Sequence, residues 1–114
     1  MTQQTNIAAY AENLMNALQS LYEGKATLAE IQSIERSELE ALYAVGYQLL
    51  ACGKAKDAAA VFRVLCTLDH LTVKHWIVLA AAEQAQRQTQ AVQVALAAVD
   101  YLTARQQLQE ETHE

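Results

Sequence analysis

LEALYAVGYQLLACGKAKDAAAVF, residues 39–62, is the stretch of this chain that decides the fold, because its pattern returns in VKHWIVLAAAEQAQRQTQAVQVAL, residues 73–96. The two stretches start 34 residues apart and agree in residue size rather than in residue identity. Large apolar residues stand at repeat positions 4 and 7 and small residues at position 8: Leu42, Val45 and Gly46 in the first stretch, Trp76, Leu79 and Ala80 in the second. An apolar pattern that returns at a fixed distance indicates a repeated structural unit.

A unit of 34 residues with this pattern is typical of the tetratricopeptide repeat, which is a pair of helices. Small residues at positions 8 and 20 let the two helices approach closely, while the residues at positions 4, 7 and 24 fill their shared core. Position 20 holds Ala58 or Val92, and position 24 holds Phe62 or Leu96. We therefore expect an all-α domain with about two repeats, over residues 39–72 and 73–106. The second repeat departs from the pattern at Glu83, where an aromatic residue is usual, and no proline closes either repeat.

The composition supports this fold class. The chain of 114 residues contains no proline and three glycines, and 53% of its residues are apolar against 18% charged. Alanine, leucine, glutamine and glutamate, which form helices well, are frequent. This balance argues against disorder, an all-β domain and a glycine-rich phosphate-binding fold. A chain of this length builds a single core, so we expect one domain.

Capping residues predict where the helices begin and end. A serine or threonine followed three residues later by a glutamate has capping-box spacing, and this occurs at Thr27 with Glu30 and at Ser37 with Glu40. Two threonines precede the last two expected helices, and two glycines follow earlier ones: Thr72 and Thr89, Gly24 and Gly53. We expect helices over residues 57–68, 73–87 and 90–109, and a frayed tail over residues 110–114.

An amphipathic helix is expected before the repeats, over residues 7–23. Its apolar residues recur at alternating spacings of four and three: Ile7, Ala11, Leu14, Leu18 and Leu21. This spacing gives a seam of apolar side chains, here called the heptad seam, along one face of the helix. Two interpretations fit the seam. The helix packs against its own domain, or it docks on a partner or on a second copy of the chain.

The first helix of each repeat is expected to line a concave groove. The positions that face such a groove are roughly 2, 5, 9 and 12. They hold Glu40, Tyr43, Tyr47 and Leu50 in the first repeat and Lys74, Ile77, Ala81 and Gln84 in the second. This surface, here called the predicted groove, suits an extended peptide with apolar anchors, but it lacks the basic residues that would clamp a terminal carboxylate. The alternative is that the two tyrosines complete the core against the N-terminal helix.

Several function classes are disfavoured by the charged and reactive residues. The formal net charge is −5 and the basic residues are scattered, which disfavours nucleic acid and anionic membranes as partners. The two cysteines imply no disulfide framework and are expected to behave as small hydrophobic residues. Cys66 and His70 have helical ligand spacing and His75 lies nearby, but no fourth ligand completes a metal site. His113 falls in the expected tail, and no nucleophile–base pattern is present. We therefore expect no metal, no cofactor and no catalysis.

Four segments together resemble the class II chaperones of bacterial type III secretion, of the LcrH/SycD type. They are TLAEI (27–31), SELEALYAVGYQLLACGK (37–54), DAAAVFRVLCTLDH (57–70) and KHW (74–76). The resemblance implies a cytoplasmic bacterial protein with tetratricopeptide repeats that keeps a hydrophobic translocator subunit soluble in its groove. It matches Tyr43, Tyr47 and Leu50 to groove residues of the first repeat helix, and it implies that the N-terminal helix dimerises.

The resemblance leaves alternatives open. Members of that family usually carry a third repeat, whereas the length of this chain is similar to that of needle-subunit chaperones, which act with a second small protein. A structural adaptor that stays in the secretion apparatus is a further alternative. Because each repeat buries its apolar face against a neighbour, we expect a homodimer or a complex with a small co-chaperone.

Overall fold

Six α-helices make up the computed structural model, which describes the backbone of residues 2–112 and the side chains of residues 7–112. No strand occurs within this part of the chain, so the predicted all-α class is confirmed. The helices are α1 (Thr2–Tyr22), α2 (Leu28–Ile31), α3 (Arg36–Ala51), α4 (Ala55–Leu68), α5 (Val73–Ala85) and α6 (Thr89–Thr112).

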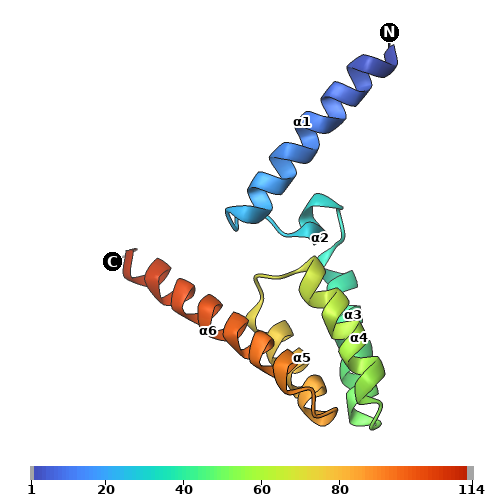
Figure 1. Ribbon diagram of the computed structural model, residues 1–114, viewed down its shortest axis with the longest axis vertical. Helices are drawn as coiled ribbons and strands as arrows, with labels where there is room; N and C mark the ends of the chain where they lie inside the picture. The colour runs from blue at the N-terminus through green and yellow to red at the C-terminus, as the bar shows by residue number, and fades with distance from the viewer. Residues whose placement is uncertain (1, 113–114) are drawn as a thin grey trace.

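Four of the helices form two antiparallel pairs, as Figure 1 shows. Helix α3 packs on α4, and α5 packs on α6, while α4 also packs on α5 and thereby joins the pairs. Helices α4 and α6 both pack on α5 rather than on each other, and in Figure 1 they diverge toward α1. This arrangement is the helix-pair architecture that the repeat pattern predicts.

The core of the first pair depends on the small residues that the repeat pattern singles out. Phe62 and Ala58 of α4 are fully buried, and Gly46 of α3 is buried opposite them. A Cβ atom added at Gly46 would overlap the ring of Phe62. The glycine is therefore required because two helix backbones approach closely over an aromatic ring.

The second pair does not repeat this core exactly as expected. Ala80 is buried, but Leu96, expected to fill the core at position 24, is 47% exposed. Its neighbour Ala95 faces α5 instead and is buried. Leu96 lies outside the core because, within residues 2–112, no helix packs on its side of α6.

The helix ends confirm some of the predicted caps. Thr27 caps α2, because its Oγ1 accepts a hydrogen bond from the backbone N–H of Glu30 at 3.2 Å. Gly24 and Gly53 follow α1 and α3 with φ of +70° and +79°, the left-handed conformation that terminates helices. The Lys54 N–H reaches back to the Leu49 carbonyl at 2.9 Å, which completes this ending for α3.

Other predicted caps are wrong. Helix α3 begins at Arg36 after Glu35, so Ser37 lies inside the helix and caps nothing. Thr72 precedes α5 as predicted, but its hydroxyl donates to Asp69 Oδ2 at 2.7 Å instead of accepting from the helix. Thr89 is the first residue of α6 rather than the residue before it.

Other expected boundaries also differ. Helix α1 covers Thr2–Tyr22 where residues 7–23 are expected, and α5 ends at Ala85 where residue 87 is expected. Helix α4 begins at Ala55, before the expected start at residue 57. Helix α6 continues to Thr112, so residues 110–112 are helical where a frayed tail is expected. Capping chemistry therefore located the helices but not each boundary, because local propensity can extend a helix past a favourable cap.

Helix α1 projects away from the two pairs (Figure 1). Most of the heptad seam is exposed: Ile7 at 67%, Leu14 at 47% and Leu18 at 51%, with Ala11 also exposed and Leu21 half-buried. In this conformation α1 therefore does not pack along its own domain. Within residues 2–112, no helix combines the length and apolar character needed to cross a membrane.

Candidate functional site

The predicted groove is built where α3 and α5 meet. Tyr43 and Tyr47, one helical turn apart on α3, stack with ring centroids 6.2 Å apart. The Nζ atom of Lys74, on α5, lies 4.6 Å from the centre of the Tyr43 ring, as a cation–π contact requires. The structure thus brings residues from both repeats onto one surface, as the repeat positions predict.

Both helices expose apolar side chains on this surface. Tyr47 is 57% exposed and Ile77 is 50% exposed. The other predicted groove residues are exposed or half-buried on the same two helices: Glu40, Tyr43 and Leu50 on α3, Lys74, Ala81 and Gln84 on α5. The alternative in which α1 covers the tyrosines is wrong, because α1 does not pack on α3.

A polar hollow of about 170 Å³ lies at the N-terminal ends of α3 and α5. Arg36 and Lys74 line it together with Glu40 and Asp69, so charges of both signs meet there. Repeat positions alone do not indicate Arg36 or Asp69, because the first precedes the repeat and the second lies in the turn after α4. The surface therefore has one charged end, which a purely apolar description misses.

His75 supports the tyrosine stack from beneath. It is 4% exposed, and its ring centroid lies 6.0 Å from that of Tyr43. Burial lowers the pKa of His75, while the backbone and carboxylate of Asp69 oppose that shift. Its Nδ1 atom lies 3.4 Å from Asp69 Oδ2. A neutral imidazole at this place fits its apolar and aromatic surroundings.

An ion pair between the buried Glu83 and the half-exposed Arg63 joins the two repeats. Glu83, the residue that departs from the repeat pattern, is 4% exposed, and its Oε1 accepts a hydrogen bond from Arg63 Nε at 3.0 Å. Trp76 likewise donates from Nε1 to the His70 carbonyl at 2.8 Å. These contacts fix α5 against α4 and thereby set the spacing of the surface.

The cysteines and histidines form no group of metal ligands within the described part of the chain. Cys66 is buried, and burial raises the pKa of its thiol to about 12, so the thiol stays protonated. Cys52 is exposed, contrary to the apolar setting expected for it. Over residues 2–112, no three His, Cys, Asp or Glu side chains gather as metal ligands would. His113 lies outside the described residues.

The chain is similar in sequence to low calcium response locus protein H from Yersinia pestis and from Yersinia pseudotuberculosis serotype I (strain IP32953). Each relative is 36% identical over 72 residues, which covers 63% of this chain and 43% of the relative. The chain thus spans less than half the length of these curated relatives. No family model matches the chain.

Solved structures share the fold. The type III secretion translocator chaperone SycD of Yersinia enterocolitica aligns with a TM-score of 0.66 at 30% identity, over 68% of this chain and 57% of SycD. A chain in a type III secretion system complex from Aeromonas hydrophila aligns with a TM-score of 0.71 at 26% identity, over 76% of this chain and 58% of that chain. Sequence and fold therefore confirm the resemblance to the LcrH/SycD type of type III secretion chaperone.

Proposed function

We propose that this chain is a type III secretion chaperone that binds an apolar segment of a secreted translocator subunit in the predicted groove and keeps that subunit soluble. The observation that carries the proposal is the pair of exposed apolar side chains Tyr47 and Ile77, which stand on neighbouring helices of one surface. Contiguous apolar surface of this kind marks interaction sites in soluble proteins.

Binding would gain free energy mainly by burial of apolar area, at roughly 25 cal/mol per Å² removed from water. Tyr47 offers a large, stiff ring that loses little conformational entropy on binding, which is typical of anchor residues. Lys74 and Arg36 at the charged end would orient the segment by pairing with acidic or carbonyl groups. Because this surface requires no cofactor, release of the client would follow from competition or from the export machinery.

The heptad seam of α1 supports a second contact. Its exposed leucines favour a homodimer or a complex with a small co-chaperone, as the repeat architecture and the resemblance both suggest. A needle-subunit chaperone and a permanent adaptor of the apparatus would use the same surfaces. The client and its fate distinguish the three, because an adaptor remains in the assembled apparatus whereas a chaperone is left behind.

Co-expression with the translocator encoded in the same secretion system tests the proposal. The wild-type chain should bring the translocator into the soluble fraction and co-purify with it. The double variant Tyr47→Ala with Ile77→Ala should lose binding by about tenfold or more, because each truncated anchor costs on the order of 1–2 kcal/mol. Both side chains are half-exposed, so the fold should survive, as circular dichroism would check.

A matched control truncates exposed apolar side chains elsewhere. Val64 is 51% exposed on α4 and Leu108 is 64% exposed on α6, and neither lies on α3 or α5. Val64→Ala with Leu108→Ala should bind the translocator normally. Equal binding by the groove variant and the control would show that the client does not use the predicted groove.

A further inference from the structure

A second apolar depression, here called the α4–α6 trough, lies between the diverging helices α4 and α6. One cavity of about 370 Å³ is lined by Arg63 and Thr67 of α4, Trp76 and Leu79 of α5 and Val94 of α6. A second cavity of about 350 Å³ is lined by Trp76, His70, Ala98 and Tyr101. Trp76 lines both cavities, and the two together, along α6, make up the α4–α6 trough.

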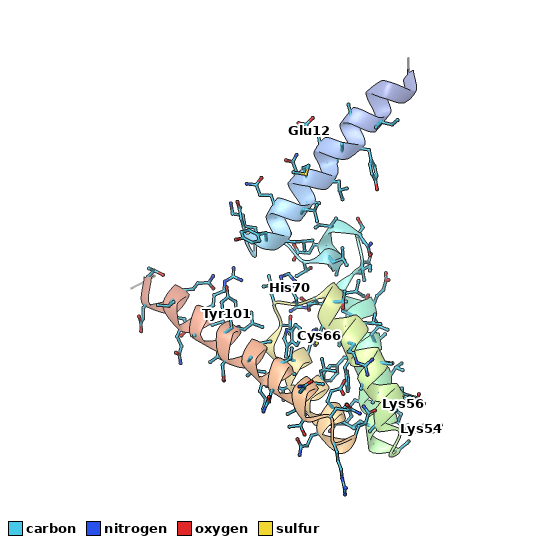
Figure 2. The ribbon with its side chains drawn as sticks, viewed as in Figure 1. Glu12, Lys54, Lys56, Cys66, His70 and Tyr101 are labelled. Atoms are coloured by element: carbon cyan, nitrogen blue, oxygen red, sulfur yellow. The ribbon has the colours of Figure 1, made fainter. Side chains whose placement is uncertain are left out.

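The end of α1 opens into this trough. Leu21 and Tyr22 line the same cavity as Tyr101, and Figure 2 shows Tyr101 and His70 on either side of the space below α1. Arg105 of α6 holds the chain just after α1, because its Nη2 donates to the carbonyl of Gly24 at 3.0 Å. Helix α1 is therefore tethered at one end of the trough, while the rest of it projects away.

The spacing of the trough wall matches that of the heptad seam. The residues of α6 that face the trough recur at spacings of three and four: Ala91, Val94, Ala98, Tyr101 and Arg105. The seam of α1 has the same alternation. With Leu21 beside Tyr101, as now, a parallel α1 would set Leu18 at Ala98 and Leu14 at Val94. The matched stretches, residues 14–21 and 94–101, each span about 10 Å at 1.5 Å per residue.

The side-chain sizes and the charge of α1 are also compatible with docking in the trough. Leu18 would meet the small residue Ala98, which allows the two helices to approach closely there. Glu12 is the only charged residue between Ile7 and Tyr22, and it lies at least about 100° around the helix from every seam residue. The charge would therefore stay in water when the seam is covered.

We propose that the α4–α6 trough is a docking surface for an amphipathic helix and that its occupant is α1 of the same chain, which swings down at residues 23–26 and lies beside α6. The tether at Gly24 makes this encounter intramolecular, which gives α1 a high effective concentration over any free partner. Docking covers Val94 and Tyr101, which are 66% and 67% exposed, together with the seam. It also withholds α1 from partners, so closure and partner binding through α1 compete. This inference does not depend on a client in the predicted groove.

Cross-linking of the full-length chain tests the docked register. The double variant Leu14→Cys with Val94→Cys, made in a Cys52→Ala background, is treated with a short bismaleimide. Cys66 stays in place, because its thiol is buried and protonated and does not react. A fast-migrating cross-linked monomer on a denaturing gel, with a yield independent of protein concentration, is the expected result. The control pair Leu14→Cys with Leu96→Cys places the second thiol at the same height on the opposite side of α6 and should give no such band.

Trp76, the only tryptophan in the chain, gives an independent readout inside the trough. Leu14→Glu with Leu18→Glu should release α1, which shifts the Trp76 emission to the red and increases its quenching by acrylamide. Asn13→Glu with Asn16→Glu adds the same charge away from the seam and should leave both unchanged. A cross-linked dimer whose yield rises with concentration would assign the trough to α1 of a second copy and overturn the proposal. So would the absence of any cross-link together with an unchanged Trp76 signal.

Discussion

Gly46→Ala tests the close approach of α3 and α4. On an ordinary helix this substitution stabilises by about 1 kcal/mol, because alanine has the better helix propensity. Here the new Cβ would lie 2.9 Å from both Cδ1 and Cζ of Phe62 and would overlap Cε1. The ring cannot move away cheaply, because Phe62 is fully buried and Tyr43 lies against it with centroids 6.1 Å apart.

The net change in the free energy of unfolding depends on two opposing effects, overpacking and helix propensity. Overpacking of a filled core costs typically about 1–3 kcal/mol, and the ring overlap places this site toward the upper end. After the gain in helix propensity, the free energy of unfolding should fall by about 1–2 kcal/mol. For a domain of this size the melting temperature should fall by roughly 4–8 °C per kcal/mol. Urea denaturation monitored by circular dichroism measures both the midpoint and the slope.

Two further variants keep the reasoning open to refutation. Phe62→Leu alone should destabilise by leaving a cavity, and it should cost less in the Gly46→Ala background, because the new methyl group fills part of that space. Gly53→Ala should destabilise for a different reason, since its φ is +79° and nothing lies within 4 Å of the added Cβ. A Gly46→Ala variant more stable than the wild type, with no coupling to Phe62, would refute the close approach.

Two other predictions concern buried polar groups. In urea denaturation, Arg63→Ala should lower the free energy of unfolding by about 1–3 kcal/mol, because it leaves the Glu83 carboxylate buried without its partner. Glu83→Met should change it little or raise it. Equal losses of unfolding free energy in the two variants would contradict this prediction. His75 has a pKa lowered from 6.5 by burial, so the unfolded chain binds more protons than the folded one as the pH falls through 6.5. The wild type should therefore lose stability between pH 7.5 and pH 5 relative to His75→Gln; the same pH dependence in both proteins would contradict this.

The repeat pattern predicted much of the candidate site. Positions 5 and 9 identified Tyr43 and Tyr47, and the contact of Lys74 with Tyr43 shows that the second repeat joins the same surface. Asp69 and His75 were missed as part of this surface because they lie in or next to the turn after α4, outside the four groove positions. Their proximity depends on how that turn brings α5 back against α3.

Sequence alone determined the secondary structure of this protein: its helices, their approximate ends, and the apolar positions along them. These features follow from propensity, capping and periodicity, which act over a few residues. The repeat pattern also predicted that two helices meet closely at Gly46, because a small residue at that repeat position allows the approach.

Only the tertiary structure decided what covers each apolar face. The same repeat position, 24, holds Phe62, which is buried against α3, and Leu96, which is 47% exposed because no described helix packs over it. Glu83 became a buried partner of Arg63 although the two are twenty residues apart. Periodicity specifies that a face avoids water, but the surface that removes the water comes from elsewhere in the chain or from another molecule, and that choice is made by long-range packing.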